Sequence, residues 1–390
     1  MLDAVTKQLL TGFIKEDFEG YDPFDGLNSR LFALSGLNLS RVARLAWLQF
    51  HKRSWINFRP MVGVPKTRNP KALALVILGL CAKYQSQPYE EGKRLALELG
   101  QWLLENACEK DQGRGYGYPF SWQARAFYVP KGTPNLIASV YVAKAFLALA
   151  QTFHLSHYVQ AAHEIAEFLS AVLFDEQAGY FYYIPGQKVL VHNANLWGAA
   201  TLASVMSSQD SAWLSQIKRA VATSVAAQHG DGAWVYGERH HHQFIDGFHT
   251  GYNLEALCLI QAKVDLSLAP VIDLGARYYF KQFFLADGTP KYYSDNIYPI
   301  DCHSVSQGIL TALLLPGYQD QANQLVAYAL KNLWNKQTQK FCYQRHKRVT
   351  NNICYMRWTQ AWMFYALATY QANQQGLLCQ QSSLAVASTV

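Results

Sequence analysis

The stretch His229–Ile260, HGDGAWVYGERHHHQFIDGFHTGYNLEALCLI, contains the pattern that predicts the fold. It opens with the turn signal Asp231-Gly232, which an aromatic residue, Trp234, follows closely. A loop rich in His, Glu, Arg and Asp comes next, and from about Thr250 the chain is almost wholly apolar over the length of a helix. Turn, polar loop and apolar helix therefore follow one another, and the same order recurs along the chain.

Two kinds of predicted helix alternate from about residue 37 onward. The first kind has apolar positions at helical spacing among Lys, Glu and Gln, as half-exposed helices do; it occurs near 39–51, 89–106, 158–173, 211–228, 271–284 and 319–334. The second kind is apolar nearly all round, as buried helices are; it occurs near 70–84, 134–153, 194–206, 250–262, 304–315 and 356–370. Residues 1–20 predict one more short amphipathic helix.

The turn signals between these helices recur at roughly 50–65 residues, the length of a helical hairpin with its loop. One such hairpin cannot bury its own apolar helix, whereas six hairpins in a closed ring can. The sequence therefore predicts an all-α fold, an (α/α)6 barrel or α/α toroid, with six outer and six inner helices. An open solenoid is the alternative. We expect residues 1–376 to form this single domain and residues 377–390 to form a flexible tail.

The loops that lead into the inner helices are long, and those that lead out of them are short. In an alternating barrel, all long loops then lie on one face, beside the N-termini of the inner helices. Long loops on a rigid scaffold are where functional sites are built. Six converging helix N-termini, with free N–H groups and positive dipole ends, also favour an anion.

Two Asp/His pairs stand at the starts of neighbouring inner helices, Asp246 with His249 and Asp301 with His303. Capping alone explains a single Asp in such a place, because Asp is a preferred N-cap residue. Two pairs that face one cavity would supply the acid and the base of a proton-transfer reaction. Together with Tyr252, which lies one turn after His249, these four residues are the predicted catalytic group.

The other polar and aromatic residues of the long loops predict a substrate-binding surface. Arginine presents a planar fork that suits carboxylate or phosphate, and aromatic faces beside Asp, Asn and Arg suit a sugar, although aromatic side chains also pack loops down. The candidates are Asp22, Asp25, Arg68, Trp122, Arg125, Lys131, Asn135, His192, Asn195, Trp234, Tyr236, Tyr293, Arg345, Tyr355, Arg357 and Trp358.

The composition sets limits on partners and surroundings. Half of the 390 residues are hydrophobic and only 16% are charged, which predicts a large interior. The net charge of +7 comes from no single block of Lys and Arg, so we expect no nucleic acid but an anionic small molecule or glycan. Seven cysteines without a CxxC motif predict reduced thiols in a cytoplasmic protein. The first residues lack the pattern of a signal peptide.

Neither a transmembrane segment nor a cofactor is expected. The longest apolar run, residues 72–82, is too short to span a bilayer. The run His240-His241-His242 resembles a metal ligand set. Successive residues rarely face one metal ion, however, and no matching Cys or His spacing accompanies them, so we expect no metal. The sequence gives no indication of the oligomeric state.

Seven stretches carry a family resemblance: 20–28 (GYDPFDGLN), 69–74 (NPKALA), 118–123 (YPFSWQ), 129–134 (VPKGTP), 248–252 (FHTGY), 298–304 (YPIDCHS) and 355–363 (YMRWTQAWM). Through them the chain resembles the bacterial polysaccharide biosynthesis proteins of the VpsJ type, which belong to capsule and exopolysaccharide loci. The resemblance covers nearly the whole chain. It implies an α/α toroid and a role in surface glycan assembly, and it supplies no reaction.

Three functional hypotheses follow. The first is an enzyme of surface polysaccharide biosynthesis that abstracts a proton from a sugar carbon next to a carboxylate, as uronate epimerases and lyases do, on an anionic or phosphate-linked substrate. The second is glycoside hydrolysis, which needs two carboxyl groups roughly 5–10 Å apart, with Asp246 and Asp301 as candidates and Asp22 or Asp25 in reserve. The third is a non-catalytic glycan-binding or assembly protein, which would show a shallow aromatic groove without pKa-shifted groups.

Overall fold

A closed ring of helices forms the centre of the computed structural model, which describes residues 2–124, 127–207 and 211–376. Within the described chain, the ring consists of six inner helices. They are α4 (Pro70–Ser86), α6 (Leu136–Phe153), α8 (His192–Val205), α10 (Gly247–Lys263), α12 (Cys302–Leu314) and α14 (Trp362–Gln374), the last of which continues from the π-helical turn η5 (Met356–Ala361). Each packs on the next, and α14 packs on α4, so the ring closes. The predicted (α/α)6 barrel is confirmed.

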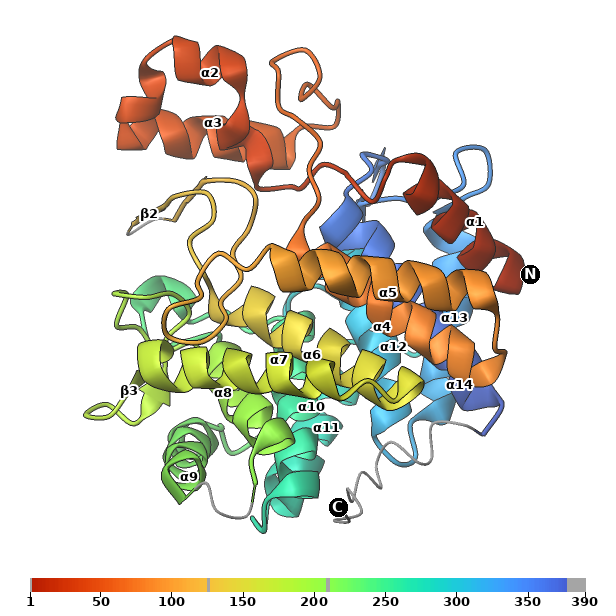
Figure 1. Ribbon diagram of the computed structural model, residues 1–390. Helices are drawn as coiled ribbons and strands as arrows, with labels where there is room; N and C mark the ends of the chain where they lie inside the picture. The colour runs from red at the N-terminus through yellow and green to blue at the C-terminus, as the bar shows by residue number, and fades with distance from the viewer. Residues whose placement is uncertain (1, 125–126, 208–210, 377–390) are drawn as a thin grey trace.

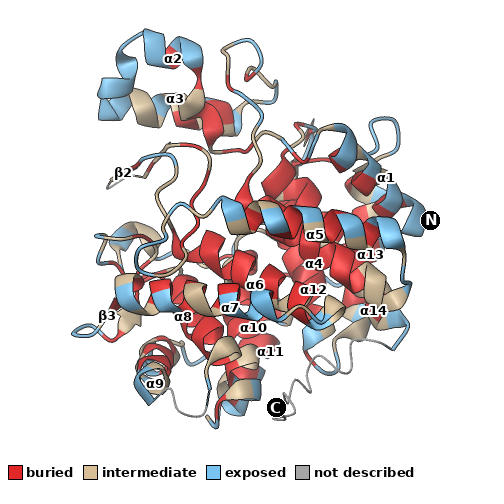
Figure 2. Ribbon diagram, viewed as in Figure 1, coloured by how far each residue is buried: buried red, intermediate tan, exposed pale blue. Residues whose placement is uncertain are grey.

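An outer layer covers the ring (Figure 1). Its described members are α1 (Leu2–Lys15), α5 (Glu90–Glu105), α7 (Ser156–Phe168) with the π-helical turn η3 (Leu169–Leu173), α9 (Ser211–Ala226), α11 (Ala269–Gln282) and α13 (Gln319–Asn332). Figure 2 shows the inner helices buried along most of their length, whereas the outer helices are buried on one face only. This difference follows from the two hydrophobic patterns of the sequence.

One predicted outer helix has a different position. The segment near 39–51 forms α3 (Arg41–Arg53), which lies with α2 (Arg30–Leu34), η1 (Asp25–Asn28) and η2 (Leu37–Leu39) in an extension beyond the barrel (Figure 1). Helix α3 buries only Leu48 and His51. Helix α1 takes the sixth outer position beside α14, because it presents a continuous apolar stripe that includes Leu9 and Phe13. We call residues 26–66 the cap.

The long loops carry short antiparallel strands, which pair in three hairpins and one three-stranded sheet. The pairs are β1 (Trp122–Gln123) with β2 (Tyr128–Val129), β3 (Phe174–Asp175) with β4 (Tyr180–Phe181), and β6 (Trp334–Asn335) with β7 (Lys340–Phe341); the sheet comprises β5 (Ile300–Asp301), β8 (Gln344–Arg345) and β9 (Thr350–Asn351). A 3-10 turn, η4 (His240–His242), lies in the loop before α10. Isolated bridges join neighbouring loops, for example Asp246 with Tyr293. The loops therefore form one connected face above the starts of the inner helices.

Helix α6 is long and apolar enough to cross a membrane by length and composition alone. It is the one such helix among the described residues, and 61% of its apolar window is buried in the protein. It packs between α4 and α8 inside the ring and under α7. The apolar surroundings of an inner barrel helix account for its composition.

Candidate active site

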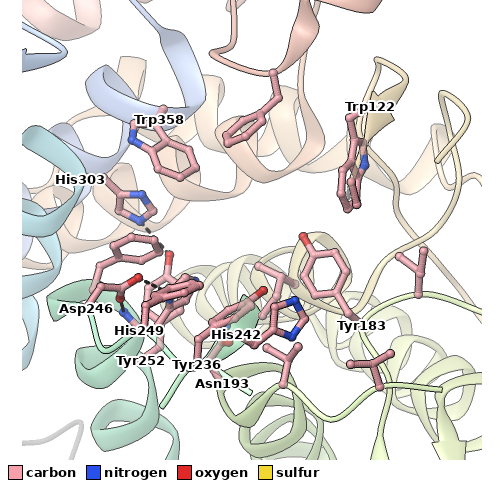
Figure 3. Close-up of a pocket in the computed structure, with 18 of the residues that line it drawn as sticks. Trp122, Tyr183, Asn193, Tyr236, His242, Asp246, His249, Tyr252, His303 and Trp358 are labelled. Carbon is pink, nitrogen blue, oxygen red and sulfur yellow. Dashed lines mark hydrogen bonds and ion pairs between the residues drawn. The ribbon is translucent and has the colours of Figure 1, made fainter. Parts of the chain in front are cut away.

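A cavity of about 530 Å³ opens where the long loops meet the starts of the inner helices. Polar and titratable side chains from several inner helices reach it, and aromatic side chains from the loops surround it (Figure 3). The lining that matters for the argument comprises Lys52, Lys71, Tyr118, Trp122, Tyr183, Tyr236, His242, Asp246, Phe248, His249, Tyr252, Tyr293, His303, Arg357 and Trp358.

His249 is held by the carboxylate that caps its own helix. Asp246 is the N-cap of α10, and its Oδ1 accepts a hydrogen bond of 2.9 Å from the backbone N–H of His249. The other carboxylate oxygen lies 2.7 Å from Nδ1 of His249. When Nδ1 donates to Asp246, Nε2 carries the lone pair, and the carboxylate stabilises the imidazolium that forms when Nε2 takes a proton. This arrangement can act as a general base.

A second set of hydrogen-bonded side chains begins at His303, on the neighbouring helix α12. Its Nε2 lies 2.8 Å from the hydroxyl of Tyr252, and that hydroxyl accepts a hydrogen bond of 3.3 Å from Nζ of Lys71. The two rings of Tyr252 and His249 lie 6.0 Å apart, centroid to centroid, on the same end of α10. Figure 3 shows the Asp246–His249 pair and the Tyr252–His303 pair at one end of the cavity. The hydrogen bond from Lys71 extends the second pair to a lysine–tyrosine–histidine series.

Burial shifts the pKa values of the three residues in this second set. Desolvation, with Lys71 and Arg357 nearby, holds the pKa of His303 well below its ordinary value, so the ring is neutral. Desolvation, with Arg357 and Lys144 nearby, likewise holds the pKa of Lys71 well below 10.5. The hydroxyl of Tyr252 keeps its proton, because burial raises its pKa well above 10. An arriving anion would favour the charged form of Lys71.

Arg357 contributes a cation whose charge is already balanced. Its Nε and Nη2 donate to the two carboxylate oxygens of Asp22, at 2.6 and 2.8 Å. The guanidinium also lies over the rings of Tyr118 and Trp358, at 4.7 and 5.3 Å from their centroids. This bidentate pair joins the N-terminal segment to η5, so it both closes the loop face and gives the cavity a fixed wall.

The opposite end of the cavity is aromatic. Figure 3 places Trp122 and Tyr183 together, away from His303 and Asp246. Their rings lie 6.3 Å apart and nearly perpendicular, and the hydroxyls of Tyr183 and Tyr118 are 3.4 Å apart. Flat apolar faces with hydroxyl edges at one end, and acid–base groups at the other, suit a molecule that is bound at one end and reacts at the other.

Nine of the predicted site residues line this cavity: Asp246, His249, Tyr252 and His303 of the catalytic set, and Trp122, Tyr236, Tyr293, Arg357 and Trp358 of the binding set. Both histidines of the predicted catalytic group therefore face one cavity. Only one of the two predicted Asp/His pairs forms between side chains, because the ring of His303 turns to Tyr252.

Asp301, predicted as a catalytic residue, lies behind the cavity wall and is not part of its lining. Its buried carboxylate accepts hydrogen bonds from the backbone N–H of His303, the amide of Gln344 and the indole of Trp358. Burial raises its pKa to about 6. It caps α12 and holds Trp358, which itself lines the cavity.

The other predicted binding residues that the structure describes do not line the cavity, and most of them are held elsewhere by contacts of their own. Asp22 and Asp25 form ion pairs with Arg357 and Arg59, and Tyr355 accepts a hydrogen bond from Arg59. Asn135 is the N-cap of α6, and Arg345 donates to Asn332. His192, Asn195 and Trp234 form hydrogen bonds with Ser224, the last with its carbonyl oxygen. Arg68 pairs with Asp17 near the surface, and Lys131 lies exposed. Arg125 lies outside the described residues.

Several cavity residues were not predicted as site residues. Lys71 is the only basic residue in the first turns of an otherwise apolar inner helix, and that isolation was the signal for it. His241 and His242 also line the cavity, although from the sequence the triple histidine was considered only as a metal ligand set. Lys52 comes from α3, and Tyr118 and Tyr183 come from loops, so only the tertiary structure reveals them. Among the described residues, no group of three or more His, Cys, Asp and Glu could hold a metal ion.

Comparison with known proteins identifies the fold by structure alone. No family model matches the sequence, and no curated protein matches it. An unsaturated glucuronyl hydrolase specific for heparin has a similar structure, with a TM-score of 0.65 and 11% identity over 96% of this chain and 98% of that chain. A D-mannose isomerase gives 0.61 at 13% identity over 80% and 88%, and a cellobiose 2-epimerase from Spirochaeta thermophila gives 0.55 at 13% identity over 79% and 87%. The toroid that the family resemblance implied is thus the fold of this chain.

Proposed function

We propose that the protein is an enzyme of the epimerase or lyase type, which removes a proton from a carbon of an anionic sugar next to its carboxylate. The observation that carries this proposal is the Asp246–His249 pair beside the Tyr252–His303 pair at one end of a single cavity. Structural likeness to proteins described as sugar epimerases, an isomerase and a glucuronyl hydrolase supports a carbohydrate substrate.

The two pairs have different tasks. Nε2 of His249 takes the proton from carbon, and Asp246 stabilises the resulting imidazolium. The carbanion is stabilised as an enolate of the adjacent carboxylate, to which the hydroxyl of Tyr252 can donate. In an epimerase a second acid, for which the hydroxyl of Tyr252 is the candidate, delivers a proton to the opposite face of that carbon and is reprotonated from solvent, while His249 loses its proton to solvent. In a lyase the group on the next carbon departs instead. The substrate carboxylate favours protonation of Lys71, 3.3 Å from Tyr252, and this charge further stabilises the enolate.

The two other hypotheses have less support from the cavity. Hydrolysis by paired carboxylates needs a second carboxyl group across the pocket, and among the described residues Asp246 is the one carboxylate of the lining. A non-catalytic glycan-binding protein would show a shallow groove without shifted titratable groups. Here the histidine and the lysine at one end of the cavity are fully buried and have strongly lowered pKa values, which is typical of acid–base sites.

Exchange of carbon-bound hydrogen with solvent tests the reaction directly. We expect the purified protein in D2O to place deuterium at one carbon of a uronate-containing oligosaccharide, observed by NMR, and to leave the neutral counterpart of that oligosaccharide unlabelled. His249→Ala should slow the exchange by about 10²–10⁴-fold, the usual contribution of a general base. The matched control is His240→Ala, which removes an exposed histidine outside the lining and should leave the rate unchanged.

Other outcomes assign the protein differently. Exchange at the wild-type rate in His249→Ala would overturn the proposed base. Release of new reducing ends without exchange would show hydrolysis, and tight binding without any turnover of the panel would show a binding protein.

The biological part of the proposal, a role in capsule, exopolysaccharide or lipopolysaccharide biosynthesis, rests on the sequence resemblance. It needs a separate experiment in cells that lack the protein. We expect their surface polysaccharide to have a changed ratio of uronate epimers or unsaturated residues, restored by the wild-type chain and not by His249→Ala. A polymer of unchanged composition would contradict this role.

A further inference from the structure

The cap has a charge pattern unlike that of the rest of the chain. No Asp or Glu occurs between Asp25 and Glu90. Over the same part of the chain the cap contains seven basic residues: Arg30, Arg41, Arg44, Lys52, Arg53, Arg59 and Lys66. The whole chain has 34 Lys and Arg and 27 Asp and Glu, so its remaining basic and acidic residues balance. The basic residues of the cap therefore equal the excess of +7 in number, although the sequence shows no uninterrupted basic run. Two of them, Arg59 and Lys66, pair with Asp25 and Glu16 outside the cap.

The cap also exposes most of the large apolar side chains that the protein presents to solvent. Nine of the sixteen exposed large hydrophobic side chains among the described residues belong to it. The most exposed are Leu34 (87%), Leu39 (85%), Met61 (78%) and Val42 (75%). Single exposed apolar residues are ordinary on a protein surface, but a concentration of this kind marks a surface that binds something.

The position of these side chains suits contact with an extended surface. Leu34, Leu39 and Val42 lie on α2, η2 and the start of α3, in the extension that projects beyond the barrel (Figure 1). Arg30, Arg41 and Arg53 are exposed on the same elements. Trp55 and Ile56, just after α3, continue the apolar surface. Segments that lie in the interface of a membrane have this composition: leucine and tryptophan beside arginine, without carboxylates.

The positive charge of the cap distinguishes between the two kinds of partner that could cover its apolar surface. A second copy of the chain would bring a cap of the same sign against this one, and the two sets of cations would repel. The headgroups of an anionic bilayer complement the arginines, and its acyl region accepts the leucines.

We propose that the cap is a membrane-docking element that binds the surface of an anionic bilayer. Leu34, Leu39 and Val42 enter the boundary between headgroups and acyl chains, and Arg30, Arg41 and Arg53 contact lipid phosphates. Because Lys52 of α3 lines the cavity, docking brings the cavity close to the membrane surface.

Vesicle co-sedimentation of the full-length protein tests this proposal. We expect binding to phosphatidylcholine vesicles that contain about one-third phosphatidylglycerol, with weaker binding at high salt and to phosphatidylcholine alone, because part of the attraction is electrostatic. The double variant Leu34→Gln/Leu39→Gln should bind at least about tenfold more weakly, since two exposed leucines no longer enter the lipid. The matched control, Val159→Gln/Leu285→Gln, changes two exposed apolar residues outside the cap and should bind like the wild type.

Three results would overturn the proposal: no sedimentation with anionic vesicles, equal loss of binding in the control variant, or a dimer in light scattering that the cap variant dissociates. The last result would show that a second copy covers the cap. His249→Ala should bind vesicles like the wild type, so the docking surface and the proposed reaction can fail independently of each other.

Discussion

At the scale of single residues, Lys71 is a cavity residue whose burial lowers the stability of the folded protein. Its Nζ lies 4.2 Å from the ring centroid of Tyr141 and 5.1 Å from that of Trp362, and the residue is 2% exposed. Its hydrogen bond to Tyr252 is with a neutral group. Burying an amine without a paired carboxylate is unfavourable, whether it is desolvated as a cation or loses its proton, so we infer that Lys71 serves binding or catalysis at the expense of stability.

We predict that Lys71→Met leaves the protein at least as stable as the wild type and impairs its function. Methionine fills a similar volume without a charge to desolvate. The KM for an anionic substrate should rise about tenfold or more, because the cation that meets the carboxylate is gone. Thermal unfolding and steady-state kinetics measure the two effects.

A second lysine, which is half-buried, supplies the control. Lys144 lies 2.5 Å from Glu255 in an ion pair, so Lys144→Met leaves a buried carboxylate without its partner and should cost about 3–5 kcal/mol. If both lysine variants lose stability to the same degree, Lys71 has a structural role and the inference is wrong.

These residues also show what the sequence reveals of a site. Asp246, His249 and Tyr252 were predictable because their spacing at the start of a helix brings them together locally. The contact of Tyr252 with His303 joins two helices, and that of Lys71 with Tyr252 joins the first and fourth inner helices. Such contacts depend on how the ring closes, which no local pattern encodes. For the same reason, Asn195 and His192 resembled binding residues although they bond Ser224 of α9.

At the scale of elements, the start of α12 shows that an Asp at a helix N-terminus can be a capping residue without being a catalytic one. Asp301 was predicted as a catalytic residue from the same pattern as Asp246, and the structure places it as the N-cap of α12 and the partner of Gln344 on β8. Asparagine is an equally good N-cap residue. We therefore expect Asp301→Asn to keep its turnover at neutral pH within a few-fold, whereas a catalytic carboxylate would show a much larger loss.

The pH dependence of stability gives an independent test of Asp301. Burial raises its pKa from 3.8 to about 6. Between these values the folded protein binds a proton that the unfolded chain does not, so this group adds stability as the pH falls through 6 and loses that contribution as the pH rises. The wild type should gain about 2 kcal/mol relative to Asp301→Asn between pH 7 and pH 4. Urea unfolding at several pH values measures it; a constant difference would show that the carboxylate is not shifted.

The elements themselves were largely predictable, and the exception has a physical reason. Two hydrophobic patterns alternate, and each predicts how much of a helix is buried. The segment 39–51 fits the amphipathic pattern but lies in the cap as α3, where Leu39 and Val42 face solvent. Periodicity reports that a helix has an apolar face; it does not report which surface covers that face. The N-terminal helix α1, with Leu9 and Phe13 buried, occupies the outer position instead.

At the scale of the whole molecule, the barrel depends on the contact between its first and last inner helices. Gly79 of α4 faces α14 at the point of closure. A Cβ added there would lie 2.6 Å from the ring of Phe364 and 3.3 Å from the backbone of Tyr365. The missing side chain lets the two helices approach closely, and a Cβ would push them apart.

We therefore predict that Gly79→Ala destabilises the protein by about 1–3 kcal/mol, the usual cost of overpacking a buried site. The matched control is Gly12→Ala in α1, where a Cβ would meet nothing within 4 Å. Alanine favours the helix by about 0.5–1 kcal/mol, so this variant should gain stability in urea unfolding. The two substitutions change the same atoms and differ only in what the new methyl group meets.

Since α14 continues from η5, which holds Arg357 in the cavity wall, a loosened closure should also weaken substrate binding in Gly79→Ala and not in Gly12→Ala. Equal stability of the two variants would show that the first and last inner helices do not need this close contact to close the ring.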